Sequence, residues 1–158
     1  MVRRAVLGLL LLAVPLSARE SLGVYDGWAA FRDAKPARCY AIAKAGGTLP
    51  APAYATVSNW PQRKVRGAVH IVLSRDVAEK AAVRLVVGDK RFDLVAKGRN
   101  AWAKDARDDA AIIAALRSAA RMSVSARSSK GAAFTDHYTL AGAATAIDAA
   151  TVGCARRS

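Results

Sequence analysis

The sequence is poor in the residues from which most enzyme sites are built. Its 158 residues include two histidines and two cysteines. It has no glycine-rich phosphate loop, no G-x-S-x-G turn and no H-E-x-x-H pair. No cluster of histidine, cysteine and acidic residues stands at metal-ligand spacing. The sequence therefore predicts no catalytic site, no metal site and no cofactor.

Long apolar runs are also lacking beyond the N-terminus. Residues 5–14 form an apolar run that is too short to span a bilayer, which takes ~20 residues. Two arginines precede this run, and a proline followed by small residues comes after it, an order typical of a secretory signal peptide. We expect residues 1–18 to be that signal peptide. Residues 19–158 should form one exported domain, periplasmic or secreted and not transmembrane.

Acidic residues are scarce, with 12 against 25 basic residues and a formal net charge of +13. A basic exported protein favours anionic partners, here an envelope component, an acidic glycan or an acidic protein, and export argues against nucleic acid. A merely solvated surface is the alternative explanation of the charge. The candidate anion-binding residues come from the basic clusters and are Arg63, Lys64, Arg66, Arg121 and Arg127.

The two cysteines, Cys39 and Cys154, allow one intramolecular pairing. In an exported chain they are expected to form a disulfide. Closing a loop of 115 residues stabilises the fold by ~4–5 kcal/mol in the chain-entropy model. The absence of a C-x-x-C motif disfavours a redox enzyme.

Alternation of apolar and polar residues predicts β-strands through much of the chain. Residues 81–98 show the clearest case, a hairpin that turns at Gly88 and Asp89. Residues 66–76 and 121–127 alternate in the same way. The predicted fold class is mainly β, an antiparallel β-sandwich or flattened barrel with two short α-helices.

The two helices interrupt this pattern. Residues 104–120 have Asp105 as the expected N-cap, with Asp108 three positions later. Residues 142–152 form the second expected helix, with Gly153 as its C-cap.

The stretch "TDHYTL" places an acid next to a histidine, which could suggest a catalytic pair. Because side chains alternate along a strand, Asp136 shares the inward face with Phe134 and Tyr138, and His137 points the other way. A buried carboxylate needs hydrogen bonds or a cation. We therefore interpret Asp136 as a buried polar anchor, held by backbone amides, a tyrosine hydroxyl or an arginine.

Three segments of the sequence, residues 26–44, 59–75 and 91–154, together show an order of elements and short motifs that is typical of a known protein family. In the last one, a strand is followed by a helix, then by "SARSSKG", "TDHYTL" and a terminal helix. Together they resemble the invasion associated locus B family of exported bacterial proteins. The resemblance implies a small periplasmic or secreted protein with a sandwich-like β core, and some members are linked to bacterial entry into host cells. Many members carry further cysteines, so this chain resembles a reduced two-cysteine branch. The resemblance provides no catalytic residue to carry over.

These observations predict an exported, non-enzymatic accessory protein that binds an anionic surface or a protein partner. One alternative is a periplasmic hydrolase in which the fold brings His70 or His137 together with Asp136. Another is a structural subunit that adds a sheet edge to an envelope assembly.

Overall fold

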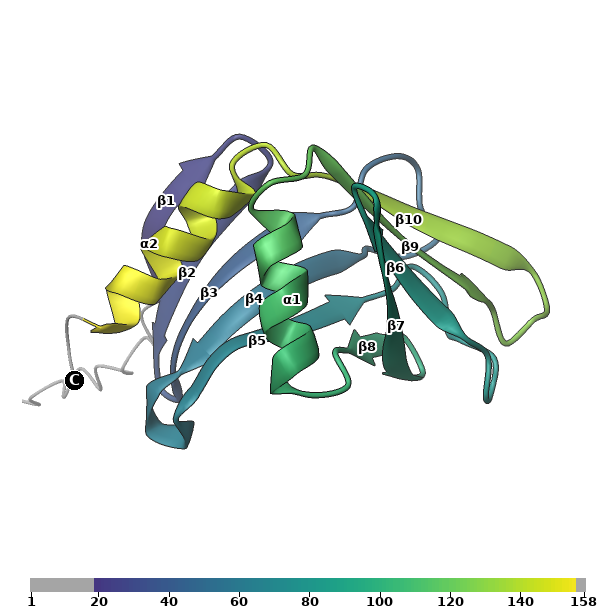
Figure 1. The fold of residues 1–158 in the computed structure, drawn as a ribbon, viewed down its shortest axis with the longest axis horizontal. Helices are drawn as coiled ribbons and strands as arrows, with labels where there is room; N and C mark the ends of the chain where they lie inside the picture. The colour runs from purple at the N-terminus through teal and green to yellow at the C-terminus, as the bar shows by residue number, and fades with distance from the viewer. Residues whose placement is uncertain (1–18, 156–158) are drawn as a thin grey trace, which may run out of the picture.

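The computed structural model describes residues 19–155, in which strands dominate (Figure 1). The expected signal peptide, residues 1–18, lies outside the described residues. The strands are β1 (Arg19–Tyr25), β2 (Trp28–Ala34), β3 (Ala37–Lys44), β4 (Tyr54–Trp60), β5 (Val65–Val72), β6 (Val83–Val87), β7 (Lys90–Lys97), β8 (Asn100–Trp102), β9 (Arg121–Arg127) and β10 (Ala133–Thr139). The helices are the short 3-10 helix η1 (Pro61–Arg63), α1 (Ala106–Leu116) and α2 (Ala143–Ala155).

Within the described residues the strands form one open antiparallel sheet, in the order β1-β2-β3-β4-β5-β8-β7-β6-β9-β10. The expectation of a mainly antiparallel β fold with two α-helices is confirmed. The sheet bends sharply at the short strand β8, which joins β5 to β7. We call β1–β5 the first half and β6–β10 the second half.

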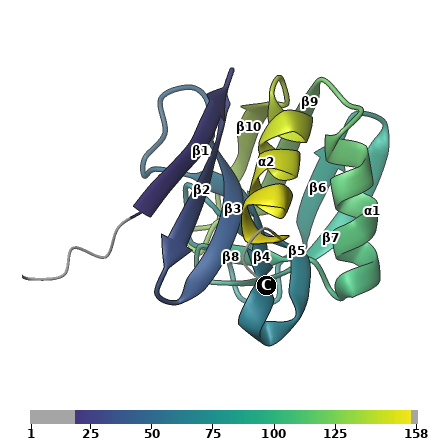
Figure 2. The same cartoon turned by 90° about the vertical axis from the view of Figure 1, so that its left-hand side faces the viewer.

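Both α-helices lie on the same side of the first half, which we call the inner face (Figure 2). Helix α2 packs on β1–β4, whereas α1 packs on β5 and reaches β6 and β7. The inner face under α2 consists largely of alanine, and so does the buried side of the helix. The buried small residues at this contact include Ala30, Ala41, Ala43, Ala55, Ala143, Ala146 and Ala150. Small residues on both surfaces let the helix lie close to the sheet.

The predicted start of α1 is confirmed, whereas the predicted end of α2 is not. Asp105 is the N-cap of α1, and its side chain accepts a hydrogen bond from the Asp108 amide at 2.9 Å, as expected. The prediction that α2 ends at Gly153 is wrong, because the helix continues to Ala155. Gly153 is buried against Leu22, and a disulfide from the next residue holds this last turn on the sheet.

The free edge of β10 is covered at its C-terminal end by the first half. The Trp28 indole donates to the Thr139 carbonyl at 3.0 Å, and the Gly46 amide donates to the His137 carbonyl at 2.9 Å. The two halves therefore enclose a single core. No helix within residues 19–155 has the length and apolar character needed to cross a bilayer.

Candidate anion-binding surface

One stretch of the chain concentrates the positive charge. Between Asp33 and Asp76 the sequence contains no acidic residue. The basic residues in this stretch are Lys35, Arg38, Lys44, Arg63, Lys64, Arg66 and Arg75. The stretch forms β3, β4 and β5 and the turns beside them, so a charge excess in the sequence becomes a charge excess in one half of the sheet.

The turn between β4 and β5 carries three of the candidate residues. Arg63 ends η1, Lys64 follows in a left-handed conformation with φ 54°, and Arg66 lies in β5. In the part of the chain that the structure describes, none of these three forms an ion pair. The turn therefore presents unneutralised positive charge.

Arginine and aromatic side chains alternate on the outer face of the first half, opposite the helices. The guanidinium carbon of Arg63 lies 5.0 Å from the Trp60 ring centre, and that of Arg38 lies 5.1 Å from the same ring. Arg38 also covers the Tyr40 ring at 3.9 Å. We call this set the arginine–aromatic ladder; its members are Arg63, Trp60, Arg38, Tyr40, Arg19 and Phe31.

Strand register produces this ladder. Phe31 pairs across strands with Tyr40, and their ring centres lie 5.8 Å apart. The long side chain of Arg19 reaches both rings, at 5.9 Å from each centre. Contacts of this kind contribute ~0.5–1 kcal/mol each at exposed sites, so their main effect here is to hold the guanidinium planes in place.

One acid neutralises part of the ladder. Asp33 accepts a hydrogen bond from Arg19 at 3.1 Å and another from Arg38 at 3.0 Å. The Asp33 hydrogen bond is the main reason why the pKa of Arg19 is raised above its ordinary value. Three arginines against one carboxylate leave the ladder with excess positive charge.

The structure does not bring Arg121 and Arg127 to this surface. They stand at the two ends of β9, which four strands separate from β4 in the sheet. Arg127 donates to the Gly131 carbonyl at 2.5 Å. The five candidate residues thus lie in two places, three at the β4–β5 turn and two in the second half.

Asp136 lies inside the core and has no exposed surface. Its Oδ2 accepts a hydrogen bond from the Ser74 backbone amide at 2.8 Å, which ties β10 to the chain just after β5. Its Oδ1 and the Tyr138 hydroxyl have no hydrogen-bond partner among the described residues. Burial raises the pKa of Tyr138, and the charge of Asp136 raises it further.

The histidines lie on the outer face. The His70 ring stacks on Trp102 with ring centres 5.5 Å apart, and its Nε2 lies 2.9 Å from the side-chain oxygen of Asn100. His137 is exposed on β10. Neither ring forms an ion pair with a carboxylate in residues 19–155.

The disulfide between Cys39 and Cys154 is present, with the two Cα atoms 5.7 Å apart. It joins β3 to the last turn of α2, beside the β4–β5 turn. The Arg32 guanidinium also donates to the Gly153 carbonyl at 3.2 Å. A structural disulfide indicates an oxidising compartment outside the cytoplasm.

Comparison with known proteins identifies this architecture. No protein-family model matches the chain, and no curated protein matches it in sequence. The crystal structure of invasion associated protein B from Bartonella henselae matches over 84% of this chain and 96% of that chain, with a TM-score of 0.62. This chain has the invasion associated protein B fold. The sequence identity is 15%, so what the two chains share is the fold, and the resemblance expected from the sequence is confirmed at that level.

The sequence indicated the basic turn but not the ladder. Trp60 adjoins the basic cluster in the sequence, which was the available signal. Arg19, Phe31 and Tyr40 come from three different strands, and their contact depends on a cross-strand register that the sequence does not specify.

Proposed function

We propose that this protein is an exported, non-enzymatic accessory protein that binds acidic glycans through the outer face of its first half. The observation that carries the proposal is the arginine–aromatic ladder, together with the unneutralised turn at its end. A guanidinium stacked on a ring can still donate through its N–H edge, and that edge matches the geometry of carboxylate and sulfate groups. Asp33 accepts from Arg19 and Arg38, whereas Arg63 forms no ion pair among the described residues. A flat row of such groups suits a repeating polyanion better than a single small ligand.

The cellular location supports this choice of partner. The disulfide indicates an oxidising compartment, and we propose that the protein is periplasmic or secreted. Acidic polysaccharides are available in these places, whereas nucleic acid is a less suitable partner for an exported protein. The excess of basic residues raises the local concentration of any polyanion near the surface.

The sheet edges support the structural-subunit alternative less well. The Gly46 amide and the Trp28 indole donate hydrogen bonds to backbone carbonyl groups on the edge of β10. Strand β1 has an irregular register between Ser21 and Gly23. Irregular and covered edges hinder pairing with another chain, so the outer face is the better candidate surface.

Binding to a heparin fragment over a salt series tests the proposal, with neutral dextran as the reference polymer. The Debye length falls from ~10 Å at 0.1 M salt to ~3 Å at 1 M, so affinity should fall steeply with added salt. The double variant Trp60→Ala, Arg63→Ala should lose about tenfold in affinity at 0.1 M salt, equivalent to ~1.4 kcal/mol.

The matched control, Arg121→Ala, removes one positive charge from the second half. It should change affinity less than about twofold, since exposed single charges contribute little. An equal loss in the control would mean that net charge, and not the ladder, attracts the polymer. Absent or salt-independent binding would also contradict the proposal.

A further inference from the structure

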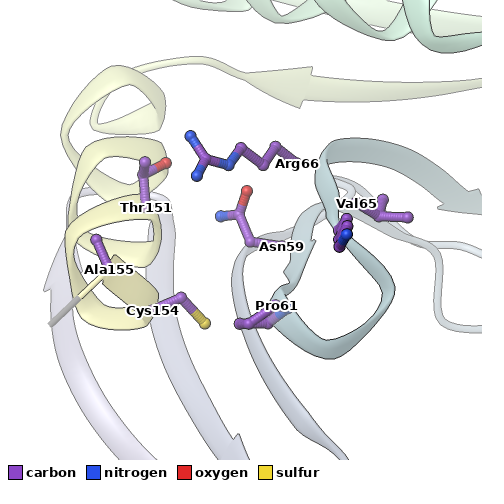
Figure 3. A pocket seen from close by; sticks show the side chains of 8 residues that line it. Asn59, Pro61, Val65, Arg66, Thr151, Cys154 and Ala155 are labelled. Atoms are coloured by element: carbon purple, nitrogen blue, oxygen red, sulfur yellow. The ribbon is translucent and has the colours of Figure 1, made fainter. Parts of the chain in front are cut away.

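A pocket of about 360 Å³ opens behind the basic turn, between the β4–β5 turn and the last turn of α2 (Figure 3). It is distinct from the ladder because it lies on the helix side of the sheet. The residues that line it are Asn59, Pro61, Lys64, Val65, Arg66, Thr151, Cys154 and Ala155. This volume is at the small end of the range for ligand pockets, ~300–1,000 Å³, and suits a compact chemical group.

The polar lining of the pocket consists mainly of hydrogen-bond donors. Figure 3 shows the Arg66 guanidinium and the Asn59 amide directed toward Thr151 on α2. The Asn59 carbonyl oxygen already accepts the Gly67 backbone amide at 3.0 Å, so its NH₂ group is left to donate. The Thr151 hydroxyl donates to the Ile147 carbonyl at 2.8 Å, which fixes its orientation.

The positive charge of the pocket lining favours an anionic ligand. No acidic residue lines the pocket, and Lys64 and Arg66 provide two positive charges. A phosphate monoester carries a charge of roughly −1.5 to −2 at neutral pH and presents three acceptor oxygens. It matches the two cations in charge and the guanidinium, ammonium and amide groups in donor chemistry.

The backbone at Lys64 gives a second reason to connect this turn with binding. Its φ of 54° and ψ of 27° lie in the left-handed region, which glycine adopts with less strain. The turn therefore carries a lysine where glycine would favour the fold. Residues held in strained backbone conformations are a feature of functional sites.

We propose that this pocket binds a terminal phosphate group, with Arg66, Lys64 and the Asn59 amide as its donors. The group can come from free inorganic phosphate or from the headgroup of a lipid, and the pocket chemistry is the same for both. The walls formed by Pro61, Val65 and Cys154 are apolar enough to contact the first carbons of a lipid.

The test is a titration of the full disulfide-bonded chain, followed through the NMR signals of the Asn59 side-chain amide and Arg66 Nε at 0.15 M salt. Three soluble ligands serve as probes: inorganic phosphate, short-chain phosphatidic acid below its micelle concentration, and short-chain phosphatidylglycerol. The first two present a terminal phosphate group, as the free ion and as a monoester, and the third carries a phosphodiester. Tighter binding of phosphatidic acid than of phosphate would identify a lipid source, and the reverse would identify free phosphate.

Two variants and one control separate this site from the ladder. Arg66→Ala and Lys64→Gly should each weaken binding of the monoester by about tenfold or more. Lys64→Gly should also keep or increase thermal stability because it relieves the left-handed backbone, so lost binding cannot be attributed to misfolding. Arg63→Ala removes the adjacent charge, which is stacked on Trp60 outside the pocket, and should change monoester affinity less than about twofold.

The same variants distinguish failure of this inference from failure of the proposed function. Arg63→Ala should weaken heparin binding and spare monoester binding, whereas Asn59→Ala should have the opposite effect. The inference is overturned if neither inorganic phosphate nor phosphatidic acid binds, or if phosphatidylglycerol binds equally well. It is also overturned if Arg63→Ala reduces binding of the terminal phosphate group as much as Arg66→Ala does.

Discussion

The two halves of the sheet place their charges differently. In the first half, residues 34–75 hold seven basic residues and no acid, and three of its arginines stack on outer-face aromatics. In residues 76–158, fourteen basic residues are accompanied by nine acidic ones. There Asp93 lies within 4.0 Å of both Arg84 and Lys104. The stretch in the first half thus carries charge of one sign, whereas the more numerous charges of residues 76–158 are mixed in sign.

The interiors of the two halves differ as well. The inner face under α2 consists of small apolar residues and is clamped by a disulfide. The core of the second half contains the buried carboxylate Asp136, which bonds across to Ser74. The first half is therefore held by close packing of small residues and a covalent bond, whereas the second half adds a buried polar contact to the shared apolar core.

Removing the disulfide should produce the largest effect on stability. In the variant Cys39→Ser, Cys154→Ser, the free energy of unfolding should fall by ~4–5 kcal/mol because the denatured chain regains the entropy of a long loop. Denaturant unfolding measures this loss. Hydrogen exchange should show that α2 and the strands beneath it lose more protection than β9 and β10. Equal loss in both halves would contradict a clamp that acts on the first half.

Two glycines with the same backbone φ test how closely the chain is packed in each half of the sheet. Gly142 and Gly131 both have φ 84°, but a Cβ at Gly142 would lie 1.9 Å from the Tyr25 carbonyl oxygen, whereas a Cβ at Gly131 would meet nothing within 4 Å. Left-handed backbone costs an alanine ~1–2 kcal/mol at either site. Gly142→Ala should therefore be more destabilising than Gly131→Ala by about 2 kcal/mol or more, measured by thermal unfolding. Equal losses would show that the start of α2 is not closely packed against the β1–β2 hairpin.

The attachment of β10 can be tested at Asp136. Asp136→Ala leaves the Ser74 amide buried without its acceptor, which should cost about 1–3 kcal/mol. Asp136→Asn keeps an oxygen in place and should cost less. Chemical denaturation of both variants gives the comparison. An alanine variant as stable as the native chain would show that Asp136 does not anchor the two halves.

The exposed pair Arg117–Asp148 should give the smallest effect. Arg117 donates to both carboxylate oxygens, at 2.7 and 3.0 Å, and this lowers the pKa of Asp148. A lowered folded-state pKa contributes stability above the unfolded pKa of the carboxyl and loses it as the pH falls through the folded value. Arg117→Ala should cost no more than about 0.5 kcal/mol at neutral pH. That cost should disappear in acid, and a loss that persisted there would contradict an ion-pair origin.

The sequence predicts those parts of the fold that depend on residues close together in the chain. The hairpin at Gly88, the N-cap at Asp105 and the inward direction of Asp136 follow from turn chemistry, capping and strand alternation, and the structure has all three. The end of α2 was misplaced because glycine usually marks a helix end, whereas Gly153 lies where only a small residue fits against Leu22.

The candidate sites depended on information that local patterns do not contain. The basic turn was visible because its residues are adjacent in the sequence. The ladder unites four strands and the 3-10 helix η1, and the pocket joins the β4–β5 turn to a helix about 90 residues further along. Arg121 and Arg127 share only their positive charge with the turn, and the sheet order separates them from it.

The measurement that tests the central claim most directly is NMR mapping of a heparin tetrasaccharide on the full disulfide-bonded chain. The account predicts the largest shifts at the Trp60 indole and at the guanidinium groups of Arg38 and Arg63. Arg121 and Arg127 should change little. Largest shifts on β9, or shifts spread evenly over all arginines, would contradict a binding surface on the first half.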